Sequence, residues 1–208
     1  MKIYALGLFL SLIIFINCEG SSSDDQNAAL ALLGGNCVAV PKTLRKHDGV
    51  STISTYQCSA SGLVYTCEAS GVSYVRTYIS ANAAKLGLFD PPESAMPISQ
   101  RGLASHKLMT PMGSVGQHYT YIYDSSQRIV SRKNEMSSGT ESFNDYDANG
   151  FPKNGGTYSY NYASGGTRPT EIADAGTITE YNSKGWVTKE DSSSDRFYES
   201  TGTLEICD

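Results

Sequence analysis

The sequence has little of what nucleic-acid-binding and nucleotide-binding proteins need. Its 16 lysines and arginines are outnumbered by 21 aspartates and glutamates, so the formal net charge is −5, and no run of basic residues occurs. An acidic chain without a basic tract is not expected to bind nucleic acid. Phosphate-binding loops and dinucleotide fingerprints are also absent. We therefore expect no nucleic-acid partner and no cofactor.

Residues with catalytic chemistry are few and scattered. The three histidines, His47, His106 and His118, are far apart and belong to no known catalytic signature. Gly113-Ser114-Val115-Gly116 lacks the spacing of a nucleophile elbow. We therefore expect no catalytic residues and a protein that is not an enzyme. The alternative is an envelope glycan or peptidoglycan hydrolase, in which two acidic residues would have to converge in a cleft. The acidic residues considered for that role are Asp145, Asp147, Glu171, Asp174 and Glu180.

No apolar run is long enough to span a membrane permanently. The longest one, Ile3 to Ile16, is interrupted only by Gly7 and Ser11 and follows the basic residue Lys2. A spanning helix needs about 20 apolar residues. A shorter run behind a basic residue is typical of a signal peptide that directs export.

The end of this run, Ile16-Asn17-Cys18, resembles a bacterial lipobox of the relaxed type found in spirochaete lipoproteins. The resemblance implies a signal peptide over residues 1–17, cleavage between Asn17 and Cys18, and a diacylglyceryl group on Cys18. Several acyl chains would attach the protein stably to a membrane, so the expected location is the outer membrane or the cell surface. An ordinary signal peptide, with Cys18 in the core, stays open.

Residues 18–36 have the composition of a tether between this anchor and a folded part. Glu19 to Asn27 contains no apolar residue, and such a stretch does not bury enough surface to become ordered. Ala28 to Leu33 is expected to form a short helix that Gly34-Gly35 stops.

Four cysteines remain once Cys18 is lipidated, and an even number in an exported chain predicts two disulfides. The favoured pairs are Cys58–Cys67 as a local link and Cys37–Cys207 as a closure of the two ends. Pairing Cys37–Cys58 with Cys67–Cys207 is the second choice. The spacings match no compact zinc pattern, so no metal site is expected.

Residues 37–116 read as an N-terminal β-rich block. Strands are expected from Cys37 to Val40, ended by Pro41, and from Ser51 to Cys58, with a solvated turn over 44–49 between them. Tyr56-Gln57-Cys58 and Tyr65-Thr66-Cys67 begin two similar units of a β-meander.

Two helices and a connector are expected in the rest of this block. The spacing of apolar residues over 74–86 predicts a helix with Gly87 as its C-cap. Residues 90–116 hold four prolines and predict a surface connector, with one short helix near Gln100–Lys107.

Residues 117–208 repeat an aromatic strand, a polar turn and a second apolar strand. The tyrosines before the five turns are Tyr123, Tyr146, Tyr162, Tyr181 and Tyr198. This pattern predicts an array of hairpins with aromatics on one face. The predicted fold class is mainly β: a twisted antiparallel sheet of hairpin repeats, a small disulfide-containing N-terminal β block, and one or two short helices.

The repeats resemble YD repeats of Rhs and teneurin-type proteins, and the first unit, with Tyr121, Tyr123, Asp124 and Arg128, is the closest match. The resemblance implies a twisted antiparallel sheet. Family members with many repeats form a hollow shell around a toxin, but five irregular copies are too few to close one.

Asp145 to Gly150 opens like a calcium-binding EF-hand loop, but Lys153 and Gly156 stand where later ligands should be, so a repeat turn is the favoured interpretation. The aromatics of the repeats are candidates for a rigid binding surface, although core packing is the favoured role of Trp186. These candidates are Tyr121, Tyr123, Tyr146, Tyr160, Tyr181 and Trp186.

The predicted function is therefore a lipid-anchored, non-enzymatic envelope protein. It would act as a scaffold or a binding surface for a protein or glycan of the host or the envelope. An envelope glycan-acting enzyme and an immunity or partner protein of a repeat toxin are the alternatives.

Overall fold

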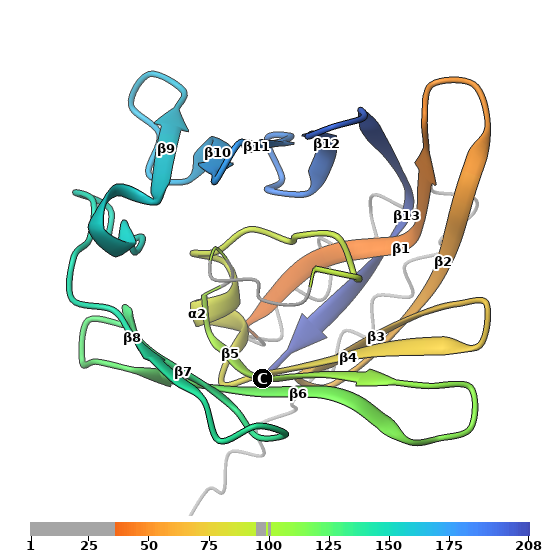
Figure 1. Cartoon of the computed structure of the whole chain (residues 1–208), viewed down its shortest axis with the longest axis horizontal. Helices are drawn as coiled ribbons and strands as arrows, with labels where there is room; N and C mark the ends of the chain where they lie inside the picture. Colours follow the sequence, from red (N-terminus) through yellow and green to blue (C-terminus); the bar gives the residue numbers. More distant parts are fainter. Residues whose placement is uncertain (1–35, 95–98, 100) are drawn as a thin grey trace, which may run out of the picture. The chain divides into compact units, whose positions relative to one another are not determined.

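Thirteen strands join into one antiparallel sheet in the computed structural model, which describes residues 36–94, 99 and 101–208 (Figure 1). The strands are β1 (Cys37–His47), β2 (Thr52–Ser61), β3 (Val64–Ala69), β4 (Val72–Tyr78), β5 (Leu103–Met109), β6 (Val115–Tyr123), β7 (Ile129–Asn134), β8 (Thr140–Ser142), β9 (Tyr158–Tyr162), β10 (Pro169–Asp174), β11 (Thr177–Tyr181), β12 (Val187–Asp191) and β13 (Arg196–Cys207). The described residues add one helical turn, α2 (Ala81–Ala84), and one 3-10 turn, η1 (Asn154–Gly156). The predicted mainly-β fold of antiparallel hairpins is confirmed.

The first and last strands lie side by side in the middle of the sheet. The order is β8-β7-β6-β5-β4-β3-β2-β1-β13-β12-β11-β10-β9, so neighbouring strands in space are also neighbours in sequence except at β1 and β13. These two long strands pair from Cys37 opposite Cys207 to His47 opposite Phe197. One sheet therefore carries both the N-terminal block and the repeat region, and β6 crosses the boundary between them.

Both favoured disulfides are present, and each joins residues that face each other on neighbouring strands. Cys37 of β1 is bonded to Cys207 of β13. Cys58 of β2 is bonded to Cys67 of β3, across the first hairpin of the meander.

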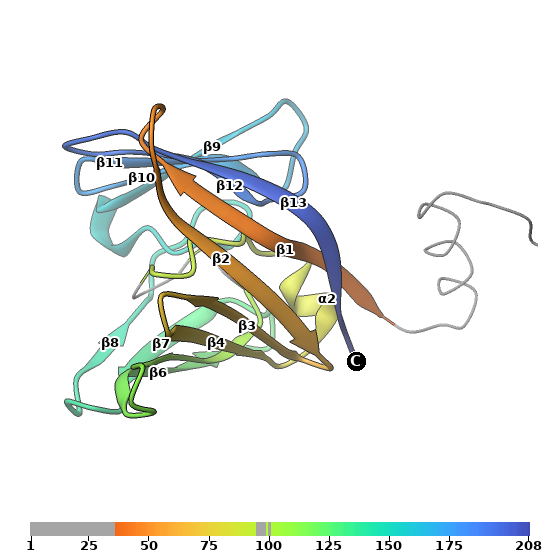
Figure 2. The same ribbon diagram turned by 90° about the vertical axis from the view of Figure 1, so that its right-hand side faces the viewer.

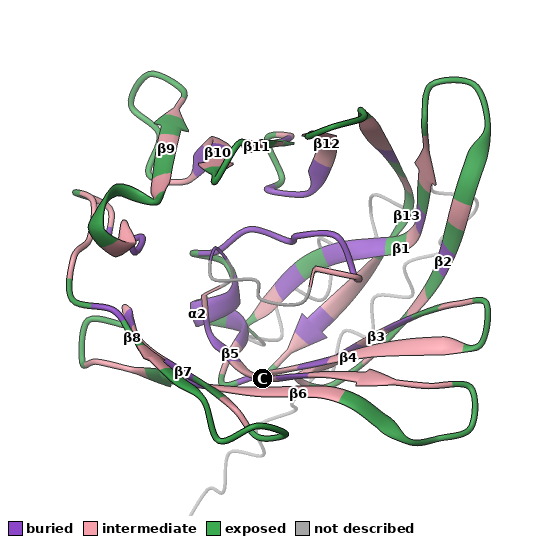
Figure 3. Cartoon of the chain, viewed as in Figure 1, coloured by how far each residue is buried: buried purple, intermediate pink, exposed green. Residues whose placement is uncertain are grey.

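The sheet curves around the chain between β4 and β5. We call residues 79–94, 99 and 101–102 the inner segment. In Figure 1 α2 lies inside the curve, and Figure 2 shows it between the two halves of the sheet. Most of α2 and the residues that follow it are buried (Figure 3). Phe89 adds a short bridge to the sheet, because its N–H donates to the Gly185 carbonyl at 2.8 Å and its carbonyl accepts from Val187 at 3.2 Å.

Several local predictions for the N-terminal block are wrong. Pro41 does not end the first strand: β1 continues to His47, and the turn follows at 48–51. The helix expected over 74–86 is strand β4 followed by the single turn α2, whose C-cap is Lys85 and not Gly87. The valines and tyrosines of this stretch favour a strand, and pairing with β3 and β5 on both sides overrides the helical spacing.

The connector expected over 90–116 is also different. Asp90, Pro91 and Pro92 are buried inside the curve of the sheet. The helix expected near Gln100–Lys107 is replaced by strand β5. The helix expected over 28–33 lies outside the described residues. No helix among the described residues is long and apolar enough to cross a membrane.

Two of the five repeat units depart from the expected hairpin. The second forms a turn closed by a single bridge between Tyr146 and Pro152, without flanking strands. The fifth contains no turn, because β13 runs through Gly202 without a break. The first, third and fourth units form the hairpins β6–β7, β9–β10 and β11–β12.

Candidate functional site

The repeat tyrosines face inward and hold the fold together. Tyr121, Tyr181 and Trp186 are buried, and the Trp186 indole N–H donates to the Ala39 carbonyl at 3.2 Å. Trp186 therefore has the core position that was favoured for it. Its indole ring also lies under the Lys184 ammonium.

The other three candidate aromatics are half-buried and bonded to backbone carbonyls. The Tyr123 hydroxyl donates to Leu103 at 3.1 Å. The Tyr146 hydroxyl lies 2.8 Å from the carbonyls of Ile129 and Phe143, and that of Tyr160 lies 2.6 Å from the Pro152 carbonyl. These hydroxyls tie the rings to neighbouring parts of the sheet, which leaves little of the ring area for a partner.

In three repeat units an aspartate or asparagine caps its own turn. One Asp147 carboxylate oxygen accepts from the N–H groups of Asn149 and Phe151, and the other accepts from the Tyr162 hydroxyl. Asp124 and Asn182 accept the corresponding pair of N–H groups in the first and fourth units. The stretch that resembles a calcium loop is thus a repeat turn, in which Asp147 already has its donors.

The remaining residues with catalytic chemistry do not meet in any of the hollows described below. Glu171 and Glu180 are cross-strand neighbours on β10 and β11, but they lie at the surface of the sheet. His47 stacks on Phe197 and His106 is buried on β5. His118 lies on β6. Burial is the main reason that its pKa is lowered, and the positive charge of Lys107 adds to it.

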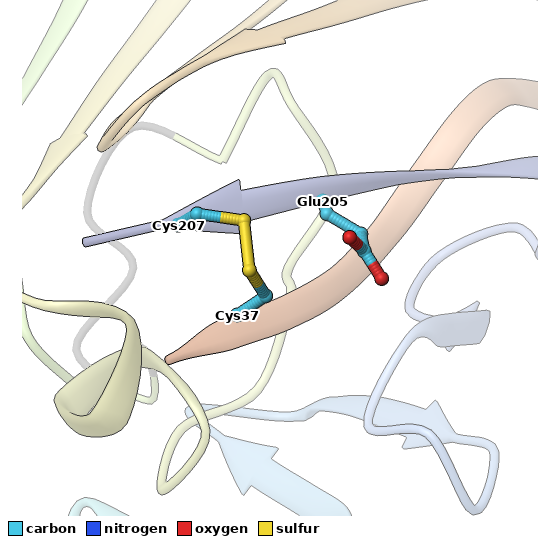
Figure 4. A group of neighbouring side chains, drawn as sticks. All are labelled: Cys37, Glu205 and Cys207. Atoms are coloured by element: carbon cyan, nitrogen blue, oxygen red, sulfur yellow. A yellow bond between two sulfur atoms is a disulfide. The ribbon is translucent and has the colours of Figure 1, made fainter. Parts of the chain in front are cut away.

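One group of three residues has the spacing of a metal site, but its sulfur atoms are not available as ligands. Cys37, Glu205 and Cys207 lie together on β1 and β13, as Figure 4 shows. A metal ion is bound by thiolates, and both sulfurs here are consumed by the disulfide. A metal at this position would require reduction first.

A buried polar centre fixes the inner segment inside the sheet. Asp90 accepts hydrogen bonds from the hydroxyls of Ser99 and Tyr181. The Arg76 guanidinium donates to the carbonyls of Asp90 at 2.9 Å and Pro91 at 2.6 Å. Burial raises the pKa of the Asp90 carboxyl, and the two hydroxyls and Arg76 oppose that change.

A second polar cluster ties the same segment to β1, β12 and β13. Glu93 pairs with the Lys46 ammonium at 2.6 Å and accepts from the Tyr198 hydroxyl at 3.1 Å. The same hydroxyl also contacts Glu190. Burial is the main reason that the pKa of Glu190 is raised, and the negative charge of Glu93 adds to it. These contacts are internal and structural.

A hollow of about 410 Å³ opens where the inner segment meets two repeat turns. Its lining residues are Lys85, Leu86, Arg101, Ala148, Asn149, Thr167 and Arg168. We call it the basic hollow, because three of these side chains are cationic and none is acidic. Other hollows differ in charge: one carries Arg132 beside its ion-pair partner Glu141, and another carries Lys184 as its only charged residue.

Two arginines of the basic hollow are placed by repeat turns in the same way. Arg101 donates to the Asn149 carbonyl, and Arg168 donates to the Lys184 carbonyl at 2.6 Å. Each acceptor immediately precedes a turn glycine, Gly150 or Gly185, with a positive φ of 83° or 77°. A Cβ added at either glycine would lie 2.5 Å from the arginine, so a glycine is needed for this close approach.

Sequence reasoning did not find the basic hollow. Arg101 comes from the end of the inner segment and Arg168 from the loop before β10, so only the tertiary fold brings them together. The usable signal was the glycine after Asn149 and after Lys184, which marks turns open to a neighbouring side chain.

Comparison with known proteins does not assign the chain: no protein-family model matches it, and no curated protein matches it.

Proposed function

We propose that the protein is a lipid-anchored, non-enzymatic binding protein of the cell envelope, and that the basic hollow is its ligand site. The observation that carries the proposal is the lining of this hollow. The lining residues carry three cations, an amide and a hydroxyl, and they come from separate parts of the chain. These are groups that bind polar or negatively charged ligands. The carboxylates that would serve a hydrolase cap turns or lie elsewhere on the sheet.

The anchor that we propose at Cys18 precedes the folded unit in the sequence. The unit begins at Asn36, whose carbonyl accepts from the backbone N–H of Asp208 at 3.1 Å. Seventeen residues lie between Cys18 and Asn36, and a chain of that length reaches at most about 60 Å.

Envelope and host extracts test the binding function directly. The fragment 19–208 would be immobilised next to the Lys85→Gln/Arg168→Gln double variant, which removes two charges from the basic hollow. We expect at least one envelope or host component to be enriched on the unmodified fragment and not on the variant. Equal enrichment on both surfaces, or none on either, would contradict the proposed site.

A further inference from the structure

We propose that the basic hollow binds a phosphate-bearing ligand. Arg101 and Arg168 would donate hydrogen bonds to the phosphoryl oxygens, and Lys85 would supply a third positive charge. The inference rests on the proposed binding function and names its ligand class. It is independent of the lipid anchor, because no residue of the hollow lies in the signal peptide or the tether.

Both guanidiniums keep donors available for a ligand. An arginine carries five N–H donors. Each turn carbonyl contacts one Nη atom of its arginine, so the remaining N–H groups of that guanidinium are not used by this contact. Arg101 is further fixed by stacking on the Phe151 ring, with its guanidinium carbon 4.6 Å from the ring centre. An arginine that is already held in place loses less entropy when it binds an anion, and its planar fork suits phosphate oxygens.

The positive charge of the hollow is poorly compensated. The acceptors of Arg101 and Arg168 are neutral carbonyls, not carboxylates. Burial lowers the pKa of both guanidiniums, which means that part of their hydration has been lost. The negative charge of Asp147 opposes this change at Arg101, whereas burial is the only cause that acts on Arg168. A bound anion would supply the counter-charge that Arg168 lacks.

The charge and the size of the hollow favour phosphate over carboxylate. A phosphate monoester carries a charge of about −1.5 to −2 at neutral pH, and a carboxylate carries −1. Three cations match the larger charge. Thr167 and Asn149 line the same space, and the Thr167 hydroxyl would bond one of the remaining oxygens. A volume of about 410 Å³ also leaves room for the sugar or glycerol that bears the phosphate.

Isothermal titration of the fragment 19–208 tests the inference, because residues 36–208 form a compact unit of their own. The probes are glycerol 3-phosphate, acetate, and vesicles of phosphatidylcholine with or without phosphatidic acid, whose headgroup is a phosphate monoester. We expect saturable binding of glycerol 3-phosphate, or of the phosphatidic acid vesicles alone if the phosphate belongs to a lipid. In either case the Lys85→Gln/Arg168→Gln variant should bind at least about tenfold more weakly.

The matched control is Lys42→Gln/Arg196→Gln, which changes the net charge equally at residues outside the hollow. Binding by this control should equal that of the unmodified fragment. The inference is overturned if no phosphate probe binds, if acetate binds as tightly as glycerol 3-phosphate, or if both double variants lose affinity to the same extent. Failure of every phosphate probe, together with capture from extracts that depends on the hollow, would reject the ligand class and leave the binding function standing.

Discussion

Cys37 and Cys207 are 170 residues apart in sequence and face each other as a bonded pair on β1 and β13. The bond joins the first strand to the last in the middle of the sheet. Among the described residues, these are the only paired strands that are distant in sequence. Every other strand pair is local. The long-range architecture of the folded unit therefore depends on this one junction and on the inner segment that packs against it.

Loss of this disulfide should cost more stability than loss of the local one. In the chain-entropy model a closed loop of 170 residues contributes about 5 kcal/mol and one of 9 residues about 2.5 kcal/mol. Urea unfolding of Cys37→Ser/Cys207→Ser and Cys58→Ser/Cys67→Ser variants measures both values. A larger loss for the second variant would contradict the role assigned to the β1–β13 junction.

Removal of the Tyr181 hydroxyl should destabilise the protein by about 2 kcal/mol. This hydroxyl donates to the buried Asp90 carboxylate, and Tyr181→Phe would leave one carboxylate oxygen without that donor. Tyr158→Phe is the matched control, because the Tyr158 hydroxyl makes no hydrogen bond with a described residue. Its unfolding free energy should change by less than about 0.5 kcal/mol. Equal losses in the two variants would show that Asp90 does not depend on Tyr181.

Glu190 should make the protein less stable as the pH rises. Burial raises the pKa of Glu190 above its ordinary value of 4.5. An acid with a raised pKa in the folded state is favourable while protonated, and its contribution falls as the pH rises from the unfolded pKa through the folded one. Glu190→Gln should therefore gain stability relative to the unmodified protein from about pH 4 upward.

Urea unfolding at a series of pH values measures this difference, with the exposed Glu180→Gln as the control. The control should run parallel to the unmodified protein. The account would be contradicted if, with rising pH, the unmodified protein gained unfolding free energy relative to Glu190→Gln.

Gly185→Ala should be more damaging than Gly176→Ala. Both glycines have a positive φ, 77° and 93°, so each substitution strains the backbone by about 1 kcal/mol. Only at Gly185 would the new methyl group also meet the Arg168 guanidinium, at 2.5 Å, whereas nothing lies within 4 Å at Gly176. We expect a loss of at least about 2 kcal/mol for Gly185→Ala and weaker phosphate binding for this variant alone. Equal stability of the two variants would contradict the contact between turn and arginine.

The sequence predicts the parts of this fold that depend on local chemistry. Glycine after a polar residue marks the turns at Gly150 and Gly185, and alternation of tyrosines marks the hairpins that flank them. Cys58 and Cys67 face each other because a hairpin joins them. Periodicity failed over 74–86, where the tyrosines and valines fit a helical face but the flanking strands impose a β conformation.

The basic hollow depends on information that a single sequence does not carry. Lys85 and Arg101 come from separate parts of the inner segment and Arg168 from the loop before β10, and each is an unremarkable cation in the sequence. They meet because the inner segment folds back into the sheet and because two turn carbonyls accept arginines. The inward direction of the aromatics was equally hidden, since alternation tells which tyrosines share a face and not which face is covered.

Metabolic labelling with palmitate is the most direct test of the central claim that the protein is an anchored envelope protein. The unmodified chain and Cys18→Ala would be expressed in a bacterium that processes lipoproteins, and the label and the intact mass of each product would be measured. We expect label in the unmodified protein, a mature chain that begins at Cys18, and no label in Cys18→Ala. Label that persists in Cys18→Ala, or an unlabelled mature protein, would contradict the anchor.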